Sequence, residues 1–254
     1  MKPGVESIAI EAARLQTEAA ARGLTLSLIG SLAIVLRCPT NAHLMAPLGR
    51  RDPQDIDFVG YQRESKQLEL LFASRGYSLH PSISHSREFG LKRLIYMDPA
   101  GHKVDIFLDA LVMAHTIDFT ERLVRNEHTV SLADLLLSKL QVHRITHNDL
   151  VDLVVLLAEH DLGQGPGQIE LEYVVRILSA DWGFQYSAIS NLATVSDLVQ
   201  HATALPPSVS TRVLTAANQL RDAVERAPKT TRWRLRARVG TRVPWYEHVD
   251  EVDL

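Results

Sequence analysis

The chain has 254 residues, of which 46% are hydrophobic and 22% charged, the ordinary composition of a globular protein large enough to bury a core. A formal net charge of −3 gives bulk electrostatics no reason to attract nucleic acid or a membrane, so any nucleic-acid site would have to be a local patch. The single cysteine, Cys38, excludes an intrachain disulfide and is expected to be a small buried hydrophobe. No segment has the pattern of a signal peptide or a bilayer-spanning run, which predicts a cytoplasmic protein without a membrane partner.

The first half of the chain predicts a mixed α/β arrangement. Apolar residues recur at helical spacing over residues 5–22, and Gly23 stands at the expected helix end. The alternating segment 24–29 predicts a strand, and a short helix is expected over 32–36, after Gly30-Ser31. Beyond a loop rich in Pro, Gly and Arg (39–54), the expected elements are a strand at 55–61, a helix at 64–75, and two strands at 88–97 and 102–109 joined by a turn at 98–101.

The second half is expected to be helical. Ser131 followed by Asp134 has the spacing of a helix start, and the helix is expected to continue to His143. Further helices are predicted over 149–160, 169–181 and 208–226, with a Gly-rich linker at 163–168 and no strong strand pattern. This change of character predicts two domains: residues 1–127, and a mainly helical domain over residues 128–254.

Three aspartates form the most informative constellation. Asp55 and Asp57 are two residues apart in a strand, so their side chains share a face and would repel each other unless a cation neutralises them. Asp105 lies in the later strand among apolar neighbours, from which its carboxylate can reach the same cation. Carboxylate oxygens of this kind suit Mg²⁺ or Mn²⁺. Taken alone, the Asp-x-Asp pattern favours a solvated edge strand that carries two acids, and Asp105 alone is compatible with an ordinary polar position on a half-exposed strand.

Gly30-Ser31 joins the first strand to a helix. A glycine lets a ligand approach the backbone closely, and the N-terminus of the following helix offers N–H groups to a phosphate. The Ser31 hydroxyl would add a hydrogen bond. The alternative interpretation is a turn glycine followed by a serine that caps the helix.

In this order, the motifs resemble the nucleotidyltransferase fold shared with DNA polymerase β, and more specifically the toxin nucleotidyltransferases of the AbiEii type. The matching segments are IGSLAIVLR (29–37), GRRDPQDIDF (49–58), KVDIF (103–107), ADLLLSKLQVHR (133–144) and NDLVDLVVLL (148–157). The resemblance implies a short mixed sheet flanked by helices, followed by a helical domain. The sequence departs from the family in a longer 39–54 loop and in Gly-Ser where many members have Gly-Gly, which leaves substrate choice open.

The resemblance also implies roles for individual residues. Asp55, Asp57 and Asp105 would hold two metal ions, and Gly30 with Ser31 would hold the β- and γ-phosphates of a nucleoside triphosphate. Lys139 would place a charge on the nucleotide, and Asp149, or Asp152 in its place, matches the acidic position that follows. Arg50 and Arg51, in the arginine-rich loop just before the acidic strand, are candidates for phosphate binding, although a surface loop is nearly as compatible with them.

The arginine-rich segment 229–242 bears on which molecule accepts the transferred nucleotide. On a strand, Arg232, Arg234, Arg236 and Arg238 would share one face, which suits an RNA or DNA backbone; the alternative is a solvated strand or tail paired with the acidic end. Three hypotheses follow. The chain is a nucleotidyltransferase that modifies tRNA or protein, as the toxin partner of an antitoxin protein; a nucleotidyltransferase of the antibiotic-resistance kind; or a non-catalytic relative that binds nucleotide or a partner protein. The three aspartates argue against the last.

Overall fold

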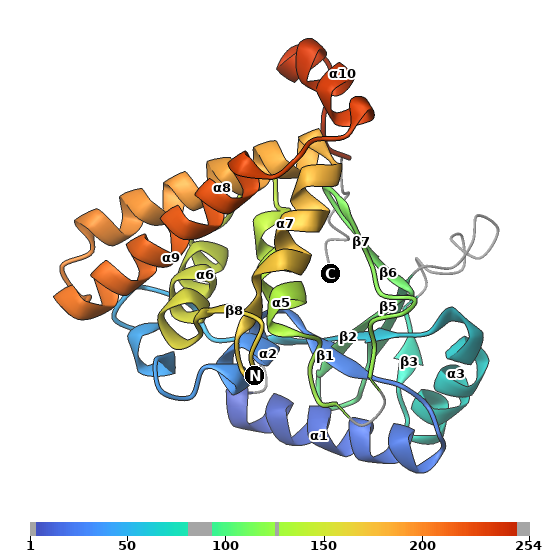
Figure 1. The fold of residues 1–254 in the computed structure, drawn as a ribbon. Coiled ribbons are helices and arrows are strands. Elements are labelled where there is room, and N and C mark those ends of the chain that lie inside the picture. The colour runs from blue at the N-terminus through green and yellow to red at the C-terminus, as the bar shows by residue number, and fades with distance from the viewer. Residues whose placement is uncertain (1–3, 81–92, 125–126, 248–254) are drawn as a thin grey trace. The chain divides into compact units, whose positions relative to one another are not determined.

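The computed structural model describes residues 4–80, 93–124 and 127–247 (Figure 1). It confirms the predicted fold class, an α+β protein with a small mixed sheet followed by helices. The chain divides into two compact units. The first consists of Met1–Leu36, Asp52–Val112 and Thr116–Val130, and the second of Arg37–Arg51, Met113–His115 and Ser131–Leu254.

The first unit contains a sheet whose strands lie in the order β1-β2-β5-β4-β3. These strands are β1 (Ser27–Ile29), β2 (Asp55–Gly60), β3 (Ser78–Leu79), β4 (Arg93–Met97) and β5 (Lys103–Leu108). Strand β2 runs parallel to β5 and antiparallel to β1, and β4 pairs antiparallel with β5 across the predicted turn. A separate hairpin joins β6 (Ala110–Val112) to β7 (Thr116–Asp118).

The described residues of this unit form the helices α1 (Val5–Ala21), α2 (Gly30–Arg37, whose last residue falls in the second unit) and α3 (Ser65–Ser74), with a 3-10 turn, η2 (Gln62–Glu64), before α3. Helix α1 packs on β2 and α3. Its buried side chains, Ile8, Ala12, Leu15 and Ala19, recur at the predicted helical spacing. Gly23 ends this segment with a φ of 71°, as the sequence predicts for the residue after a helix.

The second unit is built from helices: α5 (Leu132–Leu140), α6 (His147–Glu159), α7 (Leu171–Ala180), α8 (Trp182–His201), α9 (Pro207–Arg226) and α10 (Thr231–Val239). It also contains the 3-10 turns η1 (Ala42–Leu44) and η4 (Gly240–Arg242). Ser131 caps α5 by accepting a hydrogen bond from the Asp134 N–H, as predicted, and Thr146 caps α6 in the same way through Asp149. Cys38 is fully buried, which raises the pKa of its thiol to about 12.

Several sequence predictions need correction. Helix α5 ends at Leu140 instead of continuing to residue 143. Helix α8 was not predicted, because its apolar residues do not gather on one narrow face. Two short parallel strands, β8 (Leu162–Gly163) and β9 (Ile169–Glu170), flank the Gly-rich linker. Strand β4 begins at Arg93, and residues 88–92 of the predicted strand lie outside the described residues.

Residues 231–239 of the arginine-rich segment form helix α10, not the strand on which a shared arginine face would depend. The Thr230 hydroxyl caps the helix by accepting a hydrogen bond from the Trp233 N–H at 3.1 Å. Arginines spaced by two residues are about 200° apart around a helix, so the four alternate between two sides instead of forming one stripe. Residues 248–254, to which the alternative interpretation pairs this segment, lie outside the described residues.

Candidate functional site

The three predicted aspartates lie on one face of the sheet. Asp57 is paired with Asp105 in the parallel register of β2 and β5, and residues paired in this way point to the same side. Asp55, two residues before Asp57, shares that side. The exposure of the three carboxyl groups differs: Asp55 and Asp57 are half-buried, whereas Asp105 is only 2% exposed. A carboxylate buried to this degree requires a charged or hydrogen-bonding partner.

Two basic residues that the sequence analysis missed supply part of that charge. The Lys103 ammonium lies 3.6 Å from Asp55 Oδ2 and 3.5 Å from Asp105 Oδ2. The Arg93 guanidinium donates a hydrogen bond of 2.5 Å to Asp105 Oδ2. The two-residue spacing of Lys103 and Asp105 places both on one face of β5, so the sequence contained a signal for the lysine. Arg93 comes from a neighbouring strand, and no local pattern indicates its contact.

The donor set fits a divalent cation by its chemistry. Carboxylates on adjacent strands are the oxygen ligands that Mg²⁺ and Mn²⁺ take. The second oxygen of Asp105, Oδ1, is buried and has no hydrogen-bond partner among residues 4–80, 93–124 and 127–247. Within the same ranges, no three side chains of His, Cys, Asp or Glu are gathered closely enough to hold a metal ion. Lys103 and Arg93 each bring a positive charge to this face.

Gly30 is in direct contact with this acidic face. Its φ is 73°, and a Cβ added to it would lie 2.5 Å from Asp57 Oδ2. Two features therefore favour glycine at this position: the left-handed backbone conformation, and the Asp57 carboxylate, which occupies the space that a Cβ would need. Ile29 pairs with Asp57 across β1 and β2, which explains why the turn and the acid meet. Ser31 follows in the first turn of α2 and is half-buried.

The remaining predicted site residues belong to the second unit, where all of them except Arg51 lie in a buried ion network. Lys139 of α5 lies 2.6 Å from Asp149 Oδ1 and 3.0 Å from Asp152 Oδ2, both on α6. The Arg50 guanidinium contacts both Asp152 oxygens, at 2.5 and 3.2 Å. The side chains of Arg50 and Asp152 are 2% and 0% exposed. Arg51 is exposed, and its backbone N–H donates to the side chain of Asn148.

The network shifts the pKa values of Lys139 and Asp149. Burial by itself lowers the pKa of Lys139, but the Asp152 and Asp149 carboxylates outweigh it and raise the pKa above its ordinary value. Burial raises the pKa of Asp149, but Lys139 and the Thr146 hydrogen bonds more than offset it, so the pKa is lowered. Lys139 and Asp149 therefore carry their charges near neutral pH. Asp152, which the sequence offered only as an alternative to Asp149, binds both Lys139 and Arg50.

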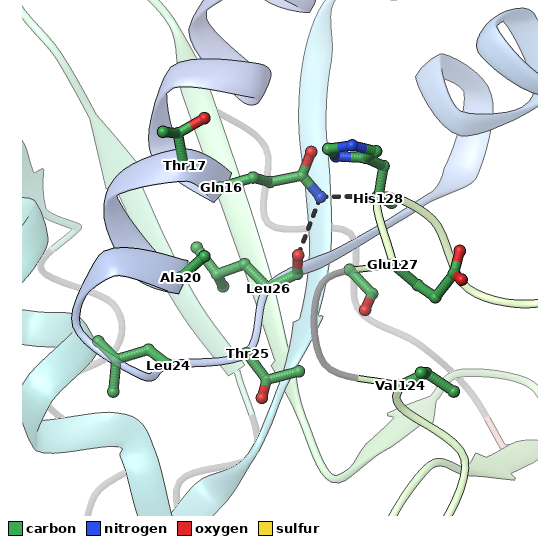
Figure 2. A pocket seen from close by; sticks show the side chains of 10 residues that line it. Gln16, Thr17, Ala20, Leu24, Thr25, Leu26, Val124, Glu127 and His128 are labelled. Atoms are coloured by element: carbon green, nitrogen blue, oxygen red, sulfur yellow. Dashed lines mark hydrogen bonds between the residues drawn. The ribbon is translucent and has the colours of Figure 1, made fainter.

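A cavity of about 310 Å³ lies elsewhere in the first unit (Figure 2). Gln16 of α1 donates hydrogen bonds to the Leu26 and His128 carbonyls, at 2.9 and 2.6 Å, and Thr25 also lines the space. The cavity lies at the start of β1, where residues 24–27 line it. Ile29, at the other end of the same strand, pairs with Asp57. It contains none of the predicted site residues.

No family model matches the chain, and no curated protein matches it. Among solved structures, one that is similar is the solution structure of the antibiotic-resistance factor ANT(2'')-Ia. The match covers 86% of this chain and 95% of that one, at 13% sequence identity and a TM-score of 0.32. A likeness this distant carries over neither residues nor activity. No helix among the described residues has both the length and the apolar character needed to cross a membrane.

Proposed function

We propose that the chain is a metal-dependent nucleotidyltransferase, which transfers a nucleoside monophosphate from a nucleoside triphosphate to an acceptor hydroxyl. The observation that supports this most strongly is the register of β2 and β5, which puts Asp55, Asp57 and Asp105 on one face. An acidic face with an unpaired buried oxygen at Asp105 suits a cation, and a glycine turn with a helix N-terminus beside it suits a phosphate. We assign this chemistry to residues 1–127 and propose that residues 128–254 form the helical partner domain.

Within this proposal, Asp55, Asp57 and Asp105 would hold Mg²⁺ or Mn²⁺. Such cations, when bound, neutralise phosphate charge and increase the acidity of an attacking hydroxyl. Gly30 and Ser31 would receive the β- and γ-phosphates at the start of α2, where backbone N–H groups have no helical acceptor. Lys103 would balance the acidic charge while no cation is bound, since it contacts Asp55 and Asp105.

The second unit would contribute to nucleotide binding through Lys139, whose side chain is 10% exposed, with Asp149 orienting it. Arg51 would offer a charge to a phosphate, because its side chain is exposed. Arg50 would act indirectly. Its guanidinium is committed to Asp152, so its contribution would be to hold α6 and the 37–51 loop in place.

The acceptor has two candidate classes. One is tRNA or protein, with the chain as a toxin controlled by an antitoxin protein; the other is a small molecule of the antibiotic type. Because residues 231–239 are helical, the arginines do not form the aligned stripe that would have favoured a nucleic-acid acceptor. A gene for a small antitoxin next to this one would favour the toxin.

The test is transfer of label. The protein is incubated with each α-labelled nucleoside triphosphate and Mg²⁺ or Mn²⁺, with tRNA, protein and aminoglycosides as separate acceptors. We expect label on one acceptor class, and we expect Asp57→Ala to reduce transfer by at least about a hundredfold without unfolding the protein. The matched control is Asp118→Asn on β7, an exposed acid outside the constellation, which should keep full activity. Transfer that survives Asp57→Ala would place the reaction at another site.

A further inference from the structure

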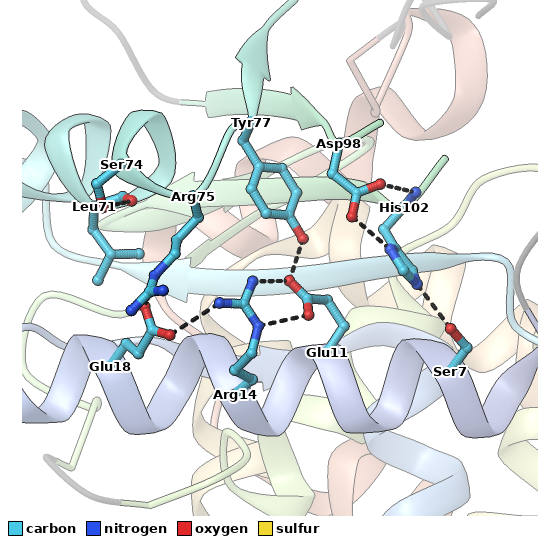
Figure 3. Close-up of polar contacts among 10 residues, drawn as sticks. All are labelled: Ser7, Glu11, Arg14, Glu18, Leu71, Ser74, Arg75, Tyr77, Asp98 and His102. Carbon is cyan, nitrogen blue, oxygen red and sulfur yellow. Dashed lines mark hydrogen bonds and ion pairs between the residues drawn. The ribbon is translucent and has the colours of Figure 1, made fainter. Parts of the chain in front are cut away.

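A chain of hydrogen bonds links a serine, a histidine and an aspartate in the first unit (Figure 3). The Ser7 hydroxyl of α1 lies 3.0 Å from His102 Nε2, and His102 Nδ1 lies 2.7 Å from Asp98 Oδ2. The serine is exposed, whereas the histidine is only 8% exposed. None of these residues belongs to the acidic face or to the ion network described above.

The turn between β4 and β5 holds the histidine in one orientation. Asp98 Oδ1 accepts a hydrogen bond from the His102 backbone N–H at 2.8 Å, while Oδ2 contacts the ring. Burial raises the pKa of Asp98, but the bonds from His102 outweigh it and keep the pKa below its ordinary value. The carboxylate is therefore ionised near neutral pH and can only accept hydrogen bonds.

This assignment decides where the protons lie. Because an ionised Asp98 can only accept, His102 Nδ1 must carry a proton and donate it. In the neutral ring the lone pair is then on Nε2, so Nε2 accepts from the Ser7 hydroxyl. The arrangement is that of a general base poised to remove a proton from a nucleophilic oxygen.

The serine opens onto a shallow cavity of about 370 Å³, lined by Glu6, Ser7, Ile10, Glu11 and His102. Ser7 stands in the first turn of α1, where backbone N–H groups have no helical acceptor, and Gly4 provides no side-chain cap. Such N–H groups stabilise an oxyanion. Ile10 is 64% exposed and offers an apolar contact. The exposed Glu6 carboxylate disfavours an anionic ligand, whereas the charge of Glu11 is paired with Arg14.

We propose that this cavity is a second reactive site, at which Ser7 is the nucleophile and His102 the general base for uncharged or cationic esters with a short apolar acyl group. Ser7 Oγ bonds to the acyl carbon while its proton passes to His102 Nε2. The ester C–O bond breaks, and the alcohol leaves with that proton. Water, deprotonated by the same nitrogen, then releases the acid and restores the serine. Asp98 is a positioning residue, which holds the ring and its tautomer.

The test uses the full chain with a fluorophosphonate probe, which phosphonylates serine and releases fluoride, and with 4-nitrophenyl acetate. The control serine is Ser74, an exposed residue whose hydroxyl donates to the Leu71 carbonyl and receives a bond from Arg22. We expect mass spectrometry to place the adduct on Ser7, formed at least about a hundredfold faster than any adduct on Ser74. Ser7→Ala should remove the adduct and the nitrophenol burst, whereas Ser74→Ala should change neither.

The competing explanation is that the Ser7–His102–Asp98 hydrogen bonds only hold α1 against the turn, and it predicts a different result. Asp98→Asn should slow labelling of Ser7 by tenfold or more, on the order expected when a general base loses its alignment. If the contacts only hold the helix, Asp98→Asn and His102→Gln would lower the melting temperature, and Ser7 would be labelled no faster than Ser74. That outcome overturns the proposal. Ser7→Ala should leave nucleotidyl transfer intact, so the two sites can be tested separately.

Discussion

Gly30→Ala should damage the acidic face through one added methyl group. The new Cβ would lie 2.5 Å from Asp57 Oδ2 and 3.3 Å from its Cγ, so the carboxylate has to rotate away. The backbone also has a φ of 73°, which a residue with a Cβ adopts only at a cost. The substitution therefore combines a backbone penalty with a displaced acid.

The chain offers a control that separates the two contributions. Gly23 has a φ of 71°, and a Cβ added there meets nothing within 4 Å. Gly23→Ala should therefore cost only the backbone penalty, about 1 kcal/mol, or roughly 2–4 °C in melting temperature. Gly30→Ala should lose a further ~0.5–1.5 kcal/mol, the cost of a side chain pushed off its rotamer.

Melting temperatures and label transfer are compared for wild type, Gly23→Ala, Gly30→Ala, Asp57→Ala and the double variant Gly30→Ala with Asp57→Ala. We expect Gly23→Ala to keep full transfer and Gly30→Ala to lose most of it. The double variant should melt close to Gly23→Ala once the effect of Asp57→Ala alone is subtracted, because the shortened side chain removes the conflict. If Gly30→Ala melts like Gly23→Ala and transfers label normally, Asp57 does not rest against Gly30 as described.

Two further predictions concern buried ionisable side chains in the second unit. Arg50→Met should lower the free energy of unfolding by about 3–5 kcal/mol in thermal or urea denaturation, because it removes a partner of the fully buried Asp152; a loss below about 1 kcal/mol would contradict the ion pair. Burial lowers the pKa of His115 to about 4 from its ordinary 6.5. Between these two pH values, His115 is protonated in the unfolded chain but not in the folded chain. Stability should fall by up to about 3 kcal/mol as the pH drops from 6.5 to 4, and His115→Gln should flatten that slope; an equal slope in both proteins would refute the assignment.

Local sequence patterns determined much of the architecture. The spacing of apolar residues predicted α1, the Ser131 cap predicted the start of α5, and the turn at 98–101 predicted the β4–β5 hairpin. These features depend on backbone geometry and on neighbours a few residues away, which is why the sequence reveals them. The alternating position of Asp55 and Asp57 on one strand is of the same kind.

The tertiary structure alone decided which distant residues meet. The parallel pairing of Asp57 with Asp105, the contact of Arg93 with Asp105, and the Arg50–Asp152 pair join segments separated by 48, 12 and 102 positions. No local periodicity encodes these contacts, because they depend on strand order and helix packing. Helix α10 shows the converse. Alternating arginines suit a strand as well as a helix, and the helix found there begins at a capping threonine, Thr230.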